Sequence, residues 1–182
     1  MKDIGTQTLE SKRLILRKIC QEDAPFIFKN WTHDPLVTKY VTWDLHPTPQ
    51  TSEEYALYKA KRYSENFRFD WIVVLKSINE PIGEIEACKV DIKDRIVEMG
   101  YCFGSAFWNQ GYATEALQTF IHYMLNQVEV DKVYARYMSS NPASGKAMQK
   151  AGMSYDATLK NYAYDEYLQK RVDLIYYSIT RS

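Results

Sequence analysis

Residues 108–116 read WNQGYATEA, a run of small and polar side chains that suits anion binding. They follow a short apolar stretch at 96–104 and precede a segment whose apolar residues recur at three- and four-residue steps, the pattern of an amphipathic helix. The first N–H groups of a helix lack partners within it and carry partial positive charge. Gly111 and Ala113 would let a phosphate approach that backbone closely. The pattern therefore predicts a phosphate-bearing ligand at residues 109–114.

The same residues also have a purely structural interpretation. Gly111 would then only let the chain turn into the helix, and Asn109 or Thr114 would only cap it. A single glycine satisfies neither the phosphate-loop pattern nor the dinucleotide fingerprint. Because no Lys or Arg lies between Arg95 and Lys132, the backbone alone is expected to hold the anion.

A second block, NPASGKAMQKAGM at residues 141–153, accompanies the first. With the EMGY sequence at 98–101, the two blocks resemble the GNAT family of acyl-coenzyme A-dependent N-acetyltransferases, most closely the RimJ/RimL-like enzymes that acetylate ribosomal-protein N-termini. The opening LESKRLILR (9–17) and the closing VDLIYYSI (172–179) resemble the same branch. The resemblance therefore spans nearly the whole chain, and the order and spacing of its segments are more specific than any one segment.

The resemblance implies one GNAT domain over residues 1–182 with an α/β fold. Its central mixed sheet of about seven strands would be splayed open and flanked by about four helices, with acetyl-coenzyme A in the wedge as co-substrate and no metal. The acceptor would be a primary amine, either a protein N-terminal α-amine or a small-molecule amine, that attacks directly in a ternary complex. A non-catalytic acyl-coenzyme A sensor or interaction module is the alternative. The resemblance also makes a homodimer plausible.

Composition argues against several other classes of protein. The 23 Lys plus Arg equal the 23 Asp plus Glu, so no net charge attracts nucleic acid or an acidic membrane surface. The three cysteines form no Cys-x-x-Cys pair, which argues against a zinc site or a disulfide framework. No secretory leader is evident, and no apolar run approaches the ~20 residues of a membrane span. We therefore expect a cytoplasmic protein.

The predicted elements follow the order expected of a mixed sheet with helices on both faces. Hydrophobic periodicity predicts strands at 13–19, 69–76, 82–90, 95–103, 132–138, 153–159 and 172–179. It predicts helices at 22–31, 51–66, 112–126 and 142–151. Residues 32–50 contain three prolines and several aromatic residues, so an irregular connection is expected there.

Acetyl transfer from a thioester to an amine needs a base for the amine's proton and a donor for the leaving thiolate. Glu98 is the first candidate for the base, because strand alternation makes it the only charge on a face shared with Cys102. Apolar surroundings there would raise its pKa. Glu84 and Glu86 are the alternative bases, and an ion pair of Glu98 with a nearby Arg or Lys is the structural alternative.

The second block predicts a helix N-terminus, with Asn141 as N-cap and Pro142 as the first helical residue. In resembling enzymes this Asn contacts the pantetheine arm and the Ser three residues on lies near the sulfur, so the resemblance makes Ser144 the candidate donor to the thiolate. Many GNAT enzymes use a Tyr on this helix instead, but its place falls on Met148, and Tyr162 and Tyr164 stay open as other donors. Lys146 is expected near the nucleotide phosphate, with a solvated helix-face lysine as the alternative.

The resemblance implies two further sets of residues. The backbone edge of the strand that ends before the anion loop is expected to pair with the pantetheine amides. The expected coenzyme-binding set thus also includes Tyr101, Cys102, Phe103, Asn109, Gln110, Gly111, Tyr112, Ala113 and Thr114. The irregular segment is expected to line the acceptor site, with substrate-binding candidates Trp31, Tyr40, Trp43, Glu84 and Tyr162.

Overall fold

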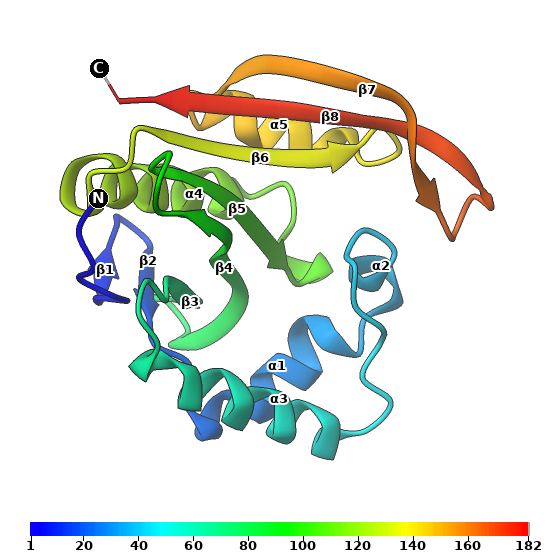
Figure 1. Ribbon diagram of the computed structural model, residues 1–182. Coiled ribbons are helices and arrows are strands. Elements are labelled where there is room, and N and C mark those ends of the chain that lie inside the picture. The colour runs from blue at the N-terminus through cyan, green and yellow to red at the C-terminus, as the bar shows by residue number, and fades with distance from the viewer. Residues whose placement is uncertain (182) are drawn as a thin grey trace.

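A computed structural model describes residues 1–181 of the chain. Within them, strands form one sheet in the order β1-β2-β3-β4-β5-β6-β8-β7 (Figure 1). Neighbouring strands are antiparallel except for the parallel pair of β5 and β6. The strands are β1 (Leu9–Glu10), β2 (Leu14–Arg17), β3 (Asp70–Leu75), β4 (Glu80–Asp91), β5 (Ile96–Phe103), β6 (Lys132–Met138), β7 (Ser154–Asp165) and β8 (Lys170–Thr180).

Helices cover both faces of this sheet (Figure 1). They are α1 (Ala24–Ile27), α2 (Pro35–Thr38), α3 (Pro49–Lys61), α4 (Tyr112–Tyr123) and α5 (Pro142–Lys150). The π-helical turn Phe28–Thr32 extends α1, and a second one, Met124–Val128, extends α4. Among these described residues, none of the helices combines the length and apolar character needed to cross a membrane.

Alternate residues of β3 divide the apolar core into two clusters, because successive side chains of a strand point to opposite faces. Trp71 belongs to the larger cluster and meets the rings of Phe120 and Tyr123 edge-on, at centroid distances of 5.6 and 5.4 Å. Ile72 belongs to the smaller cluster, with Ile27 of α1 and residues of α3. Since β3 is buried on both faces, its sequence after Asp70 is continuously apolar rather than alternating.

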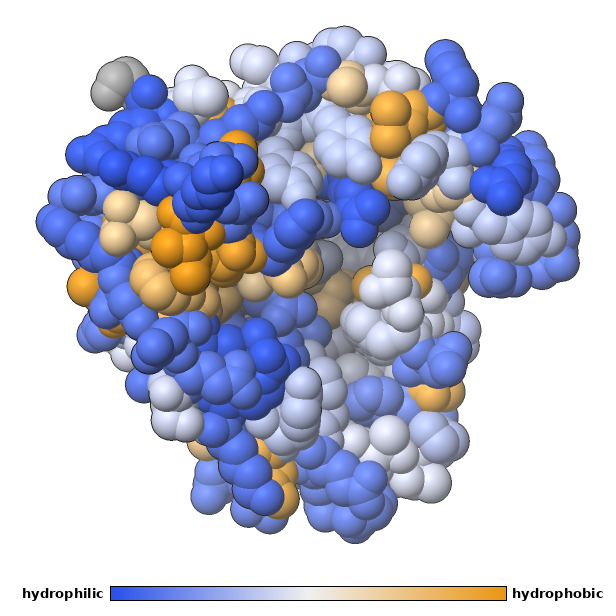
Figure 2. Space-filling model, viewed as in Figure 1, coloured by the Kyte–Doolittle hydropathy of each residue, from blue (hydrophilic) through white to orange (hydrophobic). Residues whose placement is uncertain are grey.

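The sheet opens between β5 and β6. The two strands pair only at Ile96↔Lys132, Val97↔Val133 and Glu98↔Tyr134, whereas β6 stays paired with β8 as far as Met138. Beyond Glu98 the strands separate, and this gap is called the wedge below. Figure 2, in the same view as Figure 1, shows the surface hollowed between the β6–β8 layer and the part formed by α1 to α3.

This architecture confirms the predicted α/β fold with a splayed mixed sheet. All the predicted strands and helices are present, and the structure adds β1 and α2, which are too short to produce a periodic pattern. Helix α3 begins earlier than predicted, because Thr48 is its N-cap and Pro49 its first residue. The capping box predicted at Thr51 and Glu54 therefore lies inside the helix.

Candidate active site

Helix α4 begins without a side chain to cap it. Its N-cap residue, Gly111, has φ 80° and ψ 4°, a left-handed conformation that glycine adopts at little cost. Within residues 1–181, no protein group accepts a hydrogen bond from the N–H groups of Tyr112, Ala113 or Thr114. These N–H groups are therefore available to an anion, and residues 109–114, called the anion loop below, stay the predicted anion site.

A cation lies beside the anion loop, so the prediction that the backbone acts alone is wrong. Arg13 donates from Nη1 to the carbonyl of Gln110 at 2.9 Å, and its guanidinium carbon lies 4.5 Å from the centre of the Tyr112 ring. Its Nη2 is 3.3 Å from the position that a Cβ on Gly111 would occupy. Arg13 and Gln110 are 97 residues apart in the chain, so local spacing gave no sign of this contact.

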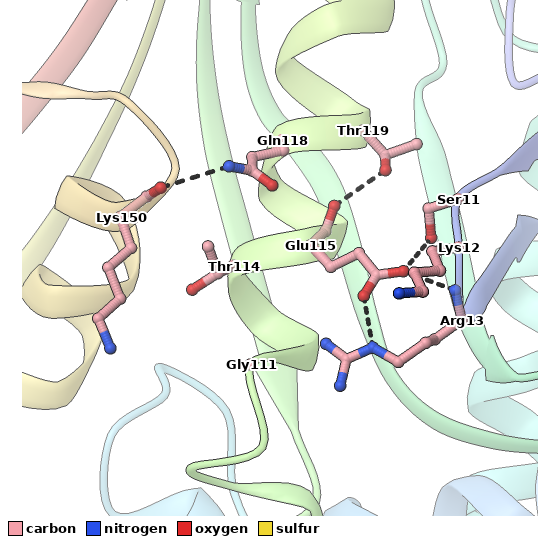
Figure 3. Close-up of a pocket in the computed structure, with 9 residues that line it drawn as sticks. All are labelled: Ser11, Lys12, Arg13, Gly111, Thr114, Glu115, Gln118, Thr119 and Lys150. Atoms are coloured by element: carbon pink, nitrogen blue, oxygen red, sulfur yellow. Dashed lines mark hydrogen bonds and ion pairs between the residues drawn. The ribbon is translucent and has the colours of Figure 1, made fainter.

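Glu115, in the first turn of α4, fixes the position of Arg13 (Figure 3). Its Oε1 accepts from Ser11 Oγ and from the backbone N–H of Arg13, both at 2.7 Å, and its Oε2 accepts from Arg13 Nε at 2.7 Å. Burial acts to raise the pKa of Glu115, but these hydrogen bonds outweigh it and the pKa is lowered. An ionised carboxylate therefore holds the start of β2 against the anion loop.

A hollow of about 510 Å³ opens beside this turn of α4 (Figure 3). Lys150, at the end of α5, and Arg13 lie on opposite sides of it, and Gln118 Nε2 fixes the end of α5 by donating to the Lys150 carbonyl at 3.3 Å. Lys146, the cation predicted for the nucleotide phosphate, is not part of its lining. The lining residues are Ser11, Lys12, Arg13, Gly111, Thr114, Glu115, Gln118, Thr119 and Lys150.

The end of β5 presents part of its backbone to the wedge. Gly104 N–H donates to the Ile82 carbonyl on β4 at 3.0 Å, so by alternation Tyr101 and Phe103 direct their backbone groups to the opposite edge. Trp108 Nε1 already donates to the Phe103 carbonyl at 2.7 Å. Of the three residues predicted to pair with pantetheine, Tyr101 is thus best placed, while Cys102 directs its backbone toward β4.

Ser144 and Tyr101 face each other across the wedge. Asn141 caps α5 as predicted, since its Oδ1 accepts from Ser144 N–H at 3.4 Å. The hydroxyl of Tyr101 lies 2.7 Å from Ser144 Oγ and 3.1 Å from the Ser144 carbonyl oxygen. Met148, at the place where the resemblance suggested a Tyr, is buried in the larger core cluster. The sequence interpretation considered only the backbone of Tyr101 and missed this side-chain contact.

Glu98 does not have the apolar surroundings predicted for it. It lies on the paired part of β5, where its Oε1 accepts from Arg136 Nε at 2.7 Å and its Oε2 accepts from Tyr134 OH at 2.8 Å. Both partners belong to β6, the neighbouring strand, so alternation along β5 alone could not reveal them. Because the Arg136 guanidinium is paired with its Oε1, Glu98 is a poor candidate for a general base, and the ion pair named as its structural alternative is present.

Glu84 is a buried carboxylate of β4, with 6% of its surface exposed. It lies opposite Cys102 in the register of β4 and β5, and Cys102 belongs to the core cluster beneath α1 and α3. Its Oε2 accepts from Tyr55 OH of α3 at 2.6 Å. Burial raises the pKa of Glu84, although the charge of Lys59 acts in the opposite direction.

A group of buried charges lies next to Glu84. Lys59 Nζ is 3.1 Å from Asp70 Oδ2 and 2.8 Å from Glu86 Oε2, and Arg68 contacts the same two carboxylates. The two cations thus contact two carboxylates, Asp70 and Glu86. Because Lys59 contacts Asp70 and Glu86 directly, Glu84 is the carboxylate left with a neutral hydrogen-bond donor.

The aromatic residues predicted for the acceptor side are only partly where they were expected. Tyr40 lies at the mouth of the wedge, with its ring centre 6.4 Å from that of Trp108. Trp43 lies 5.9 Å from the ring of His46, which in turn meets the Tyr55 ring edge-on at 5.5 Å. Tyr55 was not predicted, since its partners Glu84 and His46 lie on other segments of the chain.

Two of the predicted acceptor residues do not line the wedge. Trp31, in the π-helical turn that extends α1, is fully buried in the smaller core cluster. Tyr162 lies exposed on β7, and Tyr167, at the β7–β8 turn, approaches the α2 segment instead. The Nζ of Lys39 lies 4.0 Å from the centre of the Tyr167 ring and 5.1 Å from that of Tyr40.

Comparison with known proteins identifies the class to which this fold and site belong. The family model described as the acetyltransferase (GNAT) domain matches residues 13–154. The chain therefore belongs to the GNAT acetyltransferase family. It is 27% identical over 156 residues to the uncharacterized N-acetyltransferase YoaA of Bacillus subtilis, a match that covers 86% of this chain and 88% of that protein.

Solved structures share the fold. The GNAT-family acetyltransferase from Bacillus anthracis has a TM-score of 0.82 at 24% identity, over 96% of this chain and 98% of that one. The ribosomal α-N-protein acetyltransferase RimL, solved in complex with coenzyme A, has a TM-score of 0.81 at 14% identity, over 96% of this chain and 98% of that one. At these identities the likeness establishes the architecture, and the RimJ/RimL-like resemblance agrees with it.

The Glu115 contacts predict a pH-dependent contribution to stability. Glu115→Gln should lower the free energy of unfolding near neutral pH by about 1 kcal/mol, because it removes a charge-assisted contact that is partly exposed to solvent. Because the folded pKa is lowered, this contribution is present above the ordinary carboxyl pKa and is lost as pH falls through the folded pKa. Urea unfolding at several pH values should show wild type and variant converging in acid. A gap that persists in acid would contradict this account, and Glu53→Gln, exposed on α3, is the control.

Proposed function

We propose that this chain transfers the acetyl group of acetyl-coenzyme A to a primary amine by direct attack in a ternary complex. The observation that carries the proposal is the uncapped N-terminus of α4 at the mouth of the open wedge. The uncapped helix N-terminus suits a pyrophosphate, and the open wedge suits an extended chain with amide groups. These are successive parts of coenzyme A. Membership of the GNAT family supports acetyl transfer as the reaction class.

The donor side of the site is formed by α4, α5 and β5. The N–H groups of Tyr112, Ala113 and Thr114, with Arg13 beside them, would hold the pyrophosphate. The free backbone edge at Tyr101 would pair with the pantetheine amides. When bound, acetyl-coenzyme A supplies an activated acyl group and a thiolate leaving group. The hydroxyl of Ser144 is the polar hydrogen on α5 best placed to stabilise that thiolate.

The acceptor side is formed by α1, α2 and α3, on the opposite face of the sheet. Glu84 lies on this face with Cys102, so the proposed base and the proposed thiolate donor approach the wedge from different sides. An amine that enters from the face of α1 to α3 would lose its proton to Glu84. It would then attack an acetyl group held on the opposite face of the sheet. A buried carboxylate of raised pKa is a stronger proton acceptor than an exposed one, which supports Glu84 over Glu98.

The acceptor is proposed to be a protein N-terminal α-amine or a small-molecule amine. The fold likeness to RimL, which is named for α-N-acetylation of a ribosomal protein, supports testing peptide N-termini first. Amine-dependent release of free thiol from acetyl-coenzyme A, measured across peptides, polyamines and aminoglycosides, tests the proposal. Binding of coenzyme A without thiol release in the presence of any of these amines would overturn it in favour of a binding module.

Gly111→Val is expected to weaken the binding of coenzyme A at least tenfold, equivalent to about 1.4 kcal/mol. The added side chain would fill the approach to the anion loop, and its Cβ would stand 3.3 Å from Arg13 Nη2. Gly152→Val is the matched control, because Gly152 also has a positive φ, 96°, but nothing within 4 Å of an added Cβ. Titration calorimetry that gives equal affinities for the two variants would count against the anion loop.

Ser144→Ala is expected to reduce turnover by about 10²-fold, in the range of positioned proton donors, with little change in the KM for acetyl-coenzyme A. The Asn141 cap uses the backbone N–H of Ser144, so this substitution leaves it in place. Steady-state kinetics at saturating amine provide the measurement. Unchanged kinetics would reduce Ser144 to a structural member of the cap.

Glu84→Gln should lower kcat/KM by about 10²-fold or more and remove the acid limb of its pH profile. In the wild type, kcat/KM should rise with pH as Glu84 loses its proton, and its raised pKa moves this limb above the ordinary carboxyl range. Glu98→Gln is the matched control and should keep the limb, because Glu98 is held by Arg136 and Tyr134. The reverse pattern would return the role of base to Glu98.

A further inference from the structure

Tyr101 is the side chain that links the two halves of the open sheet at the proposed reaction site. It projects from β5, and its hydroxyl meets Ser144 on α5 beyond the point where β5 and β6 stop pairing. The side chain packs against the larger core cluster, which fixes the ring. Burial raises the pKa of Tyr101 to about 12, so the hydroxyl keeps its proton at neutral pH and remains a donor.

The positions of the oxygens limit how these hydroxyls share their protons. Tyr101 has one proton to donate, and its oxygen lies 2.7 Å from Ser144 Oγ but 3.1 Å from the Ser144 carbonyl. If Tyr101 donated to the carbonyl, the proton of Ser144 would be engaged by the phenol oxygen. If Tyr101 donates to Ser144 Oγ, the serine proton is free to point at a third atom. The 2.7 Å contact between the two hydroxyls is present in both arrangements. The second arrangement leaves the Ser144 carbonyl to its bond within α5 and leaves the serine proton free to donate to a ligand.

We propose that Tyr101 is a positioning residue that donates to Ser144 Oγ and thereby directs the serine proton at the leaving sulfur. The inference rests on the proposed function. When the C–S bond breaks, its electron pair goes to sulfur, which accepts the hydrogen bond from Ser144, while Tyr101 keeps its own proton. The acceptor ammonium first loses one proton to Glu84, and the neutral amine then bonds to the acetyl carbon. The nitrogen loses its second proton as the thiolate leaves, and this proton ends on the thiol, so no other reactant is needed.

The chain offers a matched control in Tyr137. This residue lies on the β6 side of α5, and its ring packs so closely on Gly145, the neighbour of Ser144, that a Cβ there would stand 2.4 Å from Tyr137 Cζ. Its hydroxyl makes no hydrogen bond to Ser144 among residues 1–181. Removing the Tyr137 hydroxyl therefore perturbs the same helix turn without removing the proposed donor.

Kinetics test the proposal first. Tyr101→Phe should lower kcat about tenfold, the effect of losing one hydrogen bond, with the KM for acetyl-coenzyme A unchanged. Tyr137→Phe should remain close to wild type. Because Tyr101 acts through Ser144, the double variant Tyr101→Phe/Ser144→Ala should be no slower than Ser144→Ala alone. A Tyr101→Phe enzyme as fast as wild type, or losses that add in the double variant, would overturn the proposal.

A second measurement needs no amine acceptor and keeps the two proposals apart. The thiolate absorbance of bound coenzyme A should titrate at lower pH in the wild type than in Tyr101→Phe, because the directed serine proton stabilises the thiolate. Equal titrations would overturn the role of Tyr101 even if transfer occurs. A shifted titration without amine-dependent thiol release would support that role and reject the transferase proposal.

Discussion

The separation of β5 from β6 is the constraint on which the site depends. The strands pair at three positions and then diverge, while each remains paired with its other neighbour. The divergence coincides with a bulge in β4 between Ala87 and Lys89, and bulges bend a strand and increase its twist. Gly100 accommodates the bulge, since a Cβ there would lie 2.3 Å from Cys88 Sγ. The local backbone conformation of β4 and β5 thus accompanies an exposed backbone edge at the centre of the sheet.

A free edge inside a sheet is normally a liability, because unpaired N–H and C=O groups lose water without gaining partners. Here Trp108 Nε1 donates to one of the backbone groups of this edge, the carbonyl of Phe103. The side-chain hydroxyl of Tyr101 spans the gap to α5. The remaining groups match an extended ligand with amides. Glu84 belongs to the face of the sheet covered by α1 and α3, whereas Ser144 lies on α5, which packs on the other face.

The sequence predicted what depends on local periodicity and failed where two distant segments meet. The alternation and helical spacing around the anion loop were sufficient to place β5, α4 and the glycine at the start of α4. Glu98 was misjudged because its partner Arg136 is 38 residues away on a neighbouring strand. Alternation tells which face a side chain takes, but it does not tell what the next strand presents there. Tyr55 was missed for the same reason, since its partner Glu84 lies on another element, 29 residues away.

The balanced net charge of the chain does not conflict with a polyanionic ligand, because the field at a site is set by nearby charges. Arg13, Lys12 and Lys150 line the hollow beside the N-terminus of α4, where the helix adds partial positive charge. Glu115, the acid among them, is fully engaged by Ser11 and Arg13 and so orients a cation rather than opposing the anion. On the other face, Glu84 keeps a proton-accepting group away from these cations. In the proposed reaction these cations would hold the phosphates of the coenzyme, while the carboxylate proposed to accept the amine's proton lies where they do not contact it.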